Sequence, residues 1–349
     1  MQIFIDTYGT YVHVKDEMFE IRIPEDENKK NYKKHLFSAK KVSNILMPKS
    51  AAISTDAIIL ALKYNVDILF VDYNGHPLGR VWHSKLGSTT RIRKAQLEAS
   101  MNKTGLKWVK EWVGTKMENQ IDFVKRLKKH RTGIKDYLDQ KTEKMESLHI
   151  SLCQLDGTDV KSISDTIHGL EGTSGRLYFE VMSYVLPETY RFSGRSSRPA
   201  KDPFNAFLNY AYGILYGKIE KSLIIAGLDP YLGFLHRDDY NQLSLVYDYI
   251  EPYRTYCDSL VFRLFTAKKV KKSHTDPITN GFSLNKEGKE LLVDSFNKYF
   301  DTDTIRYRGR NQTRSNTIQM DAHAFANSLI KTDYNKSDYE DYDNPLLKV

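Results

Sequence analysis

The chain is poor in cysteine and has no long apolar run. Its 349 residues include two cysteines, Cys153 and Cys257, which do not form a CxxC pair, so the sequence indicates neither a disulfide framework nor a zinc knuckle. No stretch reaches the roughly 18 consecutive apolar residues that a membrane-spanning helix needs. The amino-terminal residues are partly acidic and polar, whereas a secretory signal needs an unbroken apolar run. We therefore expect a protein of the reducing cytoplasm without a membrane partner.

A nucleotide-binding loop is also missing, because no glycine-rich GxxxxGK segment occurs; P-loop ATP chemistry is therefore not expected. The composition is that of a folded protein, with 40% hydrophobic and 12% aromatic residues, and the length allows two domains. Lys and Arg number 52 against 44 Asp and Glu, a formal charge of +8. Such an excess favours a polyanionic partner, although solubility alone would also explain it.

The first part of the chain, residues 1–85, is predicted to be a compact β-rich domain. Short β-branched or aromatic runs are separated by turn residues, and the apolar run Val66–Val71 is typical of a central strand. Ser54 is expected to cap a helix that ends near Tyr64. Asn74-Gly75 indicates a hairpin turn. The predicted fold class is therefore α+β, with a small β-rich domain ahead of a larger all-α domain over residues 99–330.

A basic helical segment follows. Residues 86–98 are expected to form the linker and the start of this segment. Between Lys85 and Arg131 the sequence has 13 Lys or Arg and 4 acidic residues. Apolar residues recur every three or four positions between Val109 and Val124, which predicts an amphipathic helix with a basic outer face. That face is either simply solvated or a track for DNA phosphates.

A group of acids near a histidine is the first candidate site. Asp248 and Glu251 are three residues apart, and Asp258 follows two helical turns later, so a helix would align them in one acidic stripe directed toward His236. Crowded carboxylates need a cation, and oxygen ligands with one imidazole suit Mg²⁺ or Mn²⁺. The alternative is a solvated acidic helix face. Because Pro252 lacks an amide hydrogen, the helix must kink or restart there.

A second candidate lies on a predicted helix that begins near Ile163 and ends before Pro187. Glu171 is in its middle, with Gly172 and Gly175 nearby. Each glycine destabilises a helix by about 1 kcal/mol relative to alanine. We interpret them as places where another helix or a nucleic-acid backbone approaches closely. A third helix is expected to begin at Asp202-Pro203 and to stop at Gly227.

Together these segments resemble the CRISPR-associated integrase and endonuclease family that captures new spacers, CRISPR-associated protein one. The amino-terminal part also looks like the small β domain of that family. The matching segments have the family's order and spacing and are Glu171-Gly172, Gly175–Phe179, Asp202–Tyr210, Gly233–His236 and Leu245–Arg254.

This resemblance implies that Glu171, His236 and Glu251 are catalytic metal ligands. Many family members carry Asp at the last of these positions, so the relative roles of Asp248 and Glu251 stay open. Asp248, Asp258 and Tyr178 are candidates for support. The candidate DNA-binding residues are Arg91, Arg93, Arg176, Arg195, Arg198, Arg237, Arg254, Arg308 and Arg310.

The resemblance further implies an enzyme of the prokaryotic cytoplasm that joins the 3′-hydroxyl ends of captured spacer DNA to a CRISPR repeat by transesterification. In the family, dimers formed through the β domain are bridged by a dimer of CRISPR-associated protein two. The alternatives are a stand-alone metal-dependent DNase, a transposon-type integrase, and a non-catalytic DNA-binding assembly subunit. Residues 331–349 are acidic and polar, and we expect them to be disordered.

Overall fold

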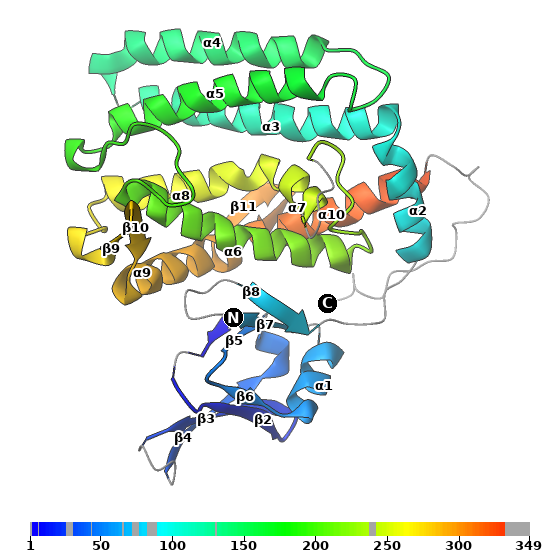
Figure 1. The fold of residues 1–349 in the computed structure, drawn as a ribbon, viewed down its shortest axis with the longest axis vertical. Helices are drawn as coiled ribbons and strands as arrows, with labels where there is room; N and C mark the ends of the chain where they lie inside the picture. The colour runs from blue at the N-terminus through cyan, green and yellow to red at the C-terminus, as the bar shows by residue number, and fades with distance from the viewer. Residues whose placement is uncertain are drawn as a thin grey trace. The chain divides into compact units, whose positions relative to one another are not determined.

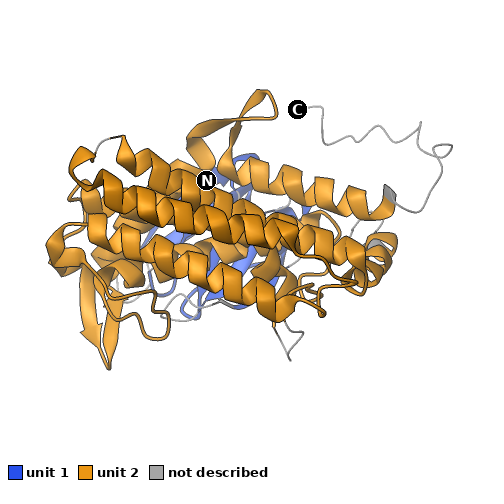
Figure 2. Cartoon of the chain, turned by 90° about the horizontal axis from the view of Figure 1, so that it is seen from above, with its two compact units in different colours: residues 1–87 blue, residues 88–349 orange. Residues whose placement is uncertain are grey.

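A computed structural model describes residues 2–5, 7–25, 31–42, 44–64, 66–71, 77–81, 89–129, 131–236 and 242–331. The chain divides into two compact units, Met1–Gly87 and Ser88–Val349 (Figure 2). The Asn74-Gly75 turn and residues 332–349 of the predicted tail lie outside the described residues. No helix in the part of the chain that the structure describes is long and apolar enough to span a membrane.

The described residues of the first unit form two four-stranded sheets, the α-helix α1 and a short 3-10 turn, Ala39–Lys41 (Figure 1). The first sheet has the order β1 (Gln2–Phe4), β5 (Asn44–Pro48), β7 (Asp67–Val71) and β8 (Pro77–Val81). The second has the order β4 (Tyr32–Ser38), β3 (Met18–Pro24), β2 (Tyr11–Lys15) and β6 (Ala52–Ile53). Helix α1 (Thr55–Lys63) begins at Ser54, whose Oγ accepts a hydrogen bond from the Ala57 amide at 3.2 Å. The predicted β-rich start is confirmed.

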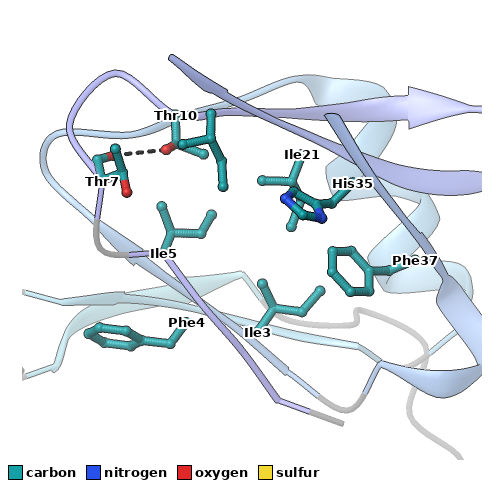
Figure 3. Close-up of a pocket in the computed structure, with 9 residues that line it drawn as sticks. Ile3, Phe4, Ile5, Thr7, Thr10, Ile21, His35 and Phe37 are labelled. Carbon is teal, nitrogen blue, oxygen red and sulfur yellow. Dashed lines mark hydrogen bonds between the residues drawn. The ribbon is translucent and has the colours of Figure 1, made fainter. Parts of the chain in front are cut away.

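A pocket of about 200 Å³ lies in this first unit, lined by side chains of both sheets (Figure 3). Its lining is mostly aliphatic and aromatic, including Ile5, Ile21 and Phe37, with His35 as its titratable side chain. The Thr10 hydroxyl at its edge donates to the Thr7 carbonyl at 2.8 Å.

The second unit is mainly helical, as predicted. In Figure 1, α3, α4 and α5 form one layer, and α6, α8 and α10 lie beneath it. The helices are α2 (Thr89–Ser100), α3 (Lys103–Lys128), α4 (Lys135–Gln154), α5 (Ser164–Val185), α6 (Pro203–Ile225), α7 (Ser244–Tyr249), α8 (Arg254–Thr266), α9 (Lys286–Asn297) and α10 (Arg314–Lys331).

The structure corrects the prediction of an all-α second domain, because two β-hairpins are present. One pairs β9 (Thr275–Ile278) with β10 (Gly281–Leu284), and the other pairs β11 (Thr304–Tyr307) with β12 (Arg310–Thr313). In the second hairpin, Arg308 and Gly309 both have positive φ, as a two-residue hairpin turn of type I′ requires. The segment that carries Arg306, Arg308 and Arg310 is therefore a defined hairpin.

Local capping explains where the helices break. The basic segment forms two helices, not one, because Asn102 Oδ1 accepts a hydrogen bond from the Thr104 amide at 2.7 Å and starts α3. Helix α6 begins as predicted, with Asp202 Oδ1 accepting from the Asn205 amide at 2.8 Å. Gly227, at φ 86°, follows its end, which is a conformation that glycine adopts at little cost.

An aromatic cluster joins the elements that carry the candidate site. Trp112 of α3 lies with its ring centroid 5.7 Å from Phe234, 5.7 Å from Tyr249 of α7 and 5.1 Å from Phe325 of α10. All four side chains are buried. Large buried rings of this kind contribute much of the packing energy. The cluster thereby fixes the segment before His236 and helix α7 against the long helix α3.

Candidate active site

Two carboxylates meet around one ammonium group in the second unit. Glu171 extends from α5, Glu251 begins the 3-10 turn Glu251–Tyr253, and Lys116 extends from α3. Lys116 Nζ donates a hydrogen bond to Glu171 Oε1. It also lies 2.6 Å from Glu251 Oε2, as an ion pair without hydrogen-bond geometry. The side chain of Glu251 is only 3% exposed, so this is a buried charge cluster.

Arg254 holds the other oxygen of Glu251. Its Nε donates to Glu251 Oε1 at 2.8 Å, and its guanidinium also donates to the Tyr216 hydroxyl at 3.1 Å. Burial opposes ionisation of Glu251, but the charges of Arg254 and Lys116 outweigh it and lower the pKa of Glu251 to about 2. Burial likewise opposes the charge of Lys116, yet Glu251 and Glu171 raise the pKa of that ammonium. Glu251 and Lys116 are therefore both charged at neutral pH.

His236 is fixed by Asp248. The imidazole Nδ1 lies 2.6 Å from Asp248 Oδ1, and because an ionised carboxylate only accepts, Nδ1 carries the proton. In the neutral ring Nε2 is then the nitrogen available to a ligand. Burial lowers the pKa of His236, but the bond to Asp248 and the charges of Asp248, Glu251 and Glu171 outweigh it and raise that pKa. His236 therefore lies within electrostatic range of both predicted glutamates.

Asp248 has a second task in the same loop. It is 2% exposed and accepts hydrogen bonds from the backbone amides of Phe234, Leu235 and His236 at 2.5, 3.0 and 3.0 Å. Both of its oxygens are thus used within the protein. Asp248 and Glu251, whose relative roles the sequence left open, therefore have different surroundings. Asp248 orients the imidazole of His236, whereas Glu251 shares Lys116 with Glu171.

The acidic stripe predicted for Asp248, Glu251 and Asp258 is wrong. Helix α7 ends at Tyr249, and α8 starts at Arg254. Between them Pro252 lies in a 3-10 turn, because it has no amide hydrogen to continue the helix. The three acids therefore belong to two helices and a turn, and they do not share one helical face.

Asp258 and Tyr178 lie in a buried layer with Tyr212. The Tyr212 hydroxyl donates to Asp258 Oδ1 at 2.6 Å, and Asp258 and Tyr178 are fully buried. Burial raises the pKa of Asp258 to about 6, against the hydrogen bond from Tyr212 and the charge of Arg195. Burial also raises the pKa of Tyr178 well above its usual range. In the described part of the chain, neither residue forms a hydrogen bond or an ion pair with Glu171 or Glu251, so both belong to the buried core around the site.

Asp258 leads to a prediction about stability. Its pKa rises from 3.8 to about 6 on folding, so the folded state binds the proton more tightly and the free energy of unfolding falls as the pH rises from about 4 to about 6. The full effect is about 3 kcal/mol. Relative to the wild type, Asp258→Asn is expected to gain stability between pH 4.5 and pH 7, because it lacks this loss. Denaturant unfolding at both pH values measures the difference, and parallel pH profiles for the two proteins would contradict the prediction.

Lys116 was not predicted as a site residue. In the sequence, Lys116 is only one of the basic residues between Lys85 and Arg131. A signal was present, because Lys116 falls on the stripe of α3 that also holds the buried residues Val113, Gln120 and Val124. A lysine within a buried stripe is rarely left without a partner. That position therefore predicts a buried carboxylate opposite it.

A cleft of about 850 Å³ opens beside the carboxylates and includes Lys116 and Glu171 in its lining. Gly172 and Gly175 form part of its wall, and a Cβ added to either would meet no atom within 4 Å. Arg176, Arg191 and Arg195 bring positive charge to it. Open space therefore lies next to both glycines, and the approach of another helix or of a nucleic-acid backbone at this place stays a prediction.

The other predicted DNA contacts are spread over several elements. Arg195 is partly held by the protein, since it donates to Ser196 O at 2.6 Å and to Asn205 Oδ1 at 2.8 Å. Arg254 is committed to Glu251, and Arg308 pairs with Asp321 at 3.0 Å. Arg91 is half-buried, and the exposed candidates are Arg93, Arg176, Arg198 and Arg310. Arg237 lies outside the described residues.

The donors around Lys116 suit a hard divalent cation. Among the described residues, no three His, Cys, Asp or Glu side chains are already gathered around one point as metal ligands. Two carboxylates nevertheless hold one cationic atom between them, and the imidazole nitrogen of His236 is oriented by Asp248. Two carboxylates with one imidazole fit Mg²⁺, and Mn²⁺ tolerates the nitrogen better.

A family model and two related proteins match the chain and carry the same family name. The family model described as CRISPR associated protein Cas1 matches residues 3–298. A CRISPR-associated endonuclease Cas1 of Archaeoglobus fulgidus is 34% identical over 339 residues, which cover 92% of this chain and 94% of that protein. A second, from Saccharolobus solfataricus, is 34% identical over 261 residues and covers 75% of this chain and 74% of that protein.

Solved structures share the fold. A casposase bound to an integration product has a TM-score of 0.77 at 23% identity and covers 96% of this chain and 92% of that chain. A CAS1 protein from Thermotoga maritima has a TM-score of 0.74 at 18% identity, covering 95% and 97%. A chain of a Cas6-RT-Cas1–Cas2 complex has the same score and identity, covering 95% of this chain and 35% of that chain.

Proposed function

The chain belongs to the Cas1 family of CRISPR-associated proteins, and on this basis we propose that it is a metal-dependent DNA integrase and endonuclease of CRISPR adaptation. It joins the 3′-hydroxyl ends of a short captured duplex to the CRISPR repeat, in the cytoplasm of a prokaryote. The observation that carries this proposal is the pair of carboxylates, Glu171 and Glu251, held by Lys116. Glu171 and Lys116 also line a cleft to which three arginines contribute positive charge.

The proposed catalytic residues are Glu171, His236 and Glu251, which would hold Mg²⁺ or Mn²⁺. When bound, the ion would lower the pKa of an attacking hydroxyl and neutralise charge on the phosphate oxygens. Asp248 keeps His236 in the tautomer that leaves Nε2 free of its proton. Arg254 holds Glu251 ionised and limits its rotation, because it occupies Oε1 at 2.8 Å. The Asp248–His236 and Arg254–Glu251 contacts therefore reduce the reorganisation of the site that the reaction requires.

The cleft would align the reacting DNA. Arg176 and Arg195 lie along it and would pair with phosphates next to the reacting bond. The oxygen of the 3′-hydroxyl then forms a bond to phosphorus while the opposite phosphorus–oxygen bond breaks, so one phosphodiester replaces another and no ATP is consumed. Water in place of the 3′-hydroxyl gives hydrolysis. Alignment of the attacking oxygen contributes much of such a rate.

The proposed partners are double-stranded DNA, a second copy of the chain and the Cas2 protein. Support comes from fold neighbours described as a casposase bound to an integration product and as a Cas6-RT-Cas1–Cas2 complex. We propose that residues 1–85 mediate homodimerisation and that a Cas2 dimer bridges two dimers. Size-exclusion chromatography with light scattering of the mixed proteins measures this stoichiometry.

Integration into a repeat tests the function directly. The protein, its Cas2 partner, Mn²⁺ and a labelled short duplex are incubated with a supercoiled plasmid that carries the repeat. The expected product is a nicked plasmid with the label joined at the repeat borders. Cleavage without target choice would favour the stand-alone DNase, and joining at unrelated sites would favour the transposon-type integrase. DNA binding with neither reaction would favour the assembly subunit.

A further inference from the structure

Lys116 occupies the position between the two carboxylates that the proposed function assigns to a metal. Its ammonium hydrogen-bonds Glu171 Oε1 and lies 2.6 Å from Glu251 Oε2. The side chain is 12% exposed, and it starts from α3 between the fully buried residues Val113 and Met117. The helix is therefore anchored on both sides of Lys116, and the ammonium is held where it bridges α5 and the Glu251–Tyr253 turn.

The charge balance explains why such a lysine is needed. Glu171 and Glu251 carry two negative charges, and Lys116 and Arg254 supply two positive ones. Without Lys116, Glu251 would retain Arg254 at 2.8 Å, whereas Glu171 would retain only weaker contacts such as the His168 imidazole, whose Nδ1 lies 3.9 Å from Glu171 Oε2 and carries a positive charge only when the ring is protonated. Two carboxylates that share a site repel each other when no cation separates them. Lys116 thus allows the pair to form in the absence of metal.

We infer that Lys116 is a built-in counterion that pre-assembles the two carboxylates and competes with the divalent cation for them. This inference rests on the proposed metal-dependent function. An ammonium and a divalent ion cannot both occupy the space between Glu171 and Glu251, because they exclude each other sterically and repel electrostatically. Binding of the ion therefore requires the Lys116 side chain to leave, and the apparent affinity of the protein for the ion is lowered by that competition.

The cleft offers the released ammonium a new partner. Lys116 lines the cleft together with Glu171 and Arg176, so a change of side-chain rotamer keeps Nζ within that space. A DNA phosphate in the cleft is the anion that would replace the lost carboxylates. DNA and metal then favour each other's binding, because each stabilises the same displaced position of Lys116. The enzyme thereby takes up its ion most readily once DNA is in place.

The test measures Mn²⁺ binding directly, through the electron paramagnetic resonance signal of free Mn²⁺, with the full-length protein. Lys116→Met is expected to bind Mn²⁺ at least tenfold more tightly than the wild type. Lys125→Met is the matched control, because Lys125 is on the same helix and pairs with Glu146 at the surface, 2.7 Å away. It should leave the affinity unchanged. Glu171→Gln identifies the site, since binding there should be lost.

Two further readouts separate competition from a merely structural role. Without metal, Lys116→Met should melt at a lower temperature than Lys125→Met, and saturating Mn²⁺ should raise its melting temperature more than that of the wild type. A short DNA duplex should tighten Mn²⁺ binding at least threefold in the wild type and have a smaller effect in Lys116→Met. If Lys116→Met does not fold, Lys116→Gln serves for the same comparisons.

The outcomes distinguish the inference from the function on which it depends. Binding that Glu171→Gln abolishes, but that is equal or weaker in Lys116→Met, would overturn the counterion role and leave the proposed function intact. If no Mn²⁺ binding sensitive to Glu171→Gln is found in either protein, the proposed metal site itself fails. Tighter binding in Lys116→Met together with reduced coupling to DNA supports the inference.

Discussion

Replacing His236 by alanine is expected to lower the rate of DNA joining by at least roughly 100-fold, because even residues that only orient metal ligands change metal affinity 10- to 100-fold. The fold should persist. Asp248 keeps its three backbone amide donors when the imidazole is removed, so no buried donor loses its acceptor. Half-site integration with Mn²⁺, followed over time at saturating DNA, measures the rate.

The control for this variant is His149→Ala. His149 lies on α4, where it pairs with Glu118 at 3.3 Å, and no step of the proposed reaction uses it. Its integration rate should match that of the wild type. The two variants should also have melting temperatures within a few degrees of each other. If His236→Ala integrates DNA at the wild-type rate, His236 is not a residue of the proposed site, even if replacing either glutamate abolishes integration.

A large loss of stability is expected from Asp248→Ala. Three amide donors lose their acceptor, and those of Phe234 and Leu235 are buried. An unsatisfied buried donor costs about 1–3 kcal/mol, although water can enter the shortened site. We expect a loss of about 3 kcal/mol, or a fall in melting temperature of roughly 6–12 °C for a unit of this size. Integration should also slow by roughly 10- to 100-fold, because His236 loses its orientation.

Asp248→Asn separates the two roles of this residue. Asparagine has the same shape, but it directs an NH₂ group at donors that need an acceptor. Its stability should fall between those of the wild type and Asp248→Ala. Asp301→Ala is a suitable control, because Asp301 accepts from Lys218 at 2.9 and 3.0 Å and is 29% exposed, so water can replace it. A melting temperature of Asp248→Ala no lower than that of Asp301→Ala would refute the anchoring role.

The overall architecture followed from local signals that act over short distances. Ser54 and Asp202 were predictable helix starts because an N-cap depends only on a side chain and an amide three residues ahead. Pro252 marked a break for an equally local reason. The resemblance to the family rested on motifs around Glu171, His236 and Glu251, and the pattern of the chain allowed these residues to be named as a set.

The features of the site that the sequence did not predict depend on contacts between segments that are far apart in the chain. Lys116 meets Glu171 and Glu251 across 55 and 135 positions of the chain, and no periodicity within one helix specifies such partners. The acidic stripe failed because helical spacing was extended through Pro252, beyond the end of α7. The two hairpins of the second unit are only four residues per strand, too short for a clear alternation of apolar and polar residues.

The alternation of positive and negative side chains through the site also limits which amino-acid substitutions these positions tolerate. From α5 inward, Glu171, Lys116, Glu251 and Arg254 alternate in sign, each next to its opposite. A single replacement in this row leaves a neighbour with an uncompensated charge in a poorly hydrated place, which is strongly destabilising. We therefore expect these four positions to covary among homologues. A substitution that changes the charge at one position should be accompanied by a second that keeps the sum of the four charges at zero. Redesign for another metal would have to proceed by such compensated pairs.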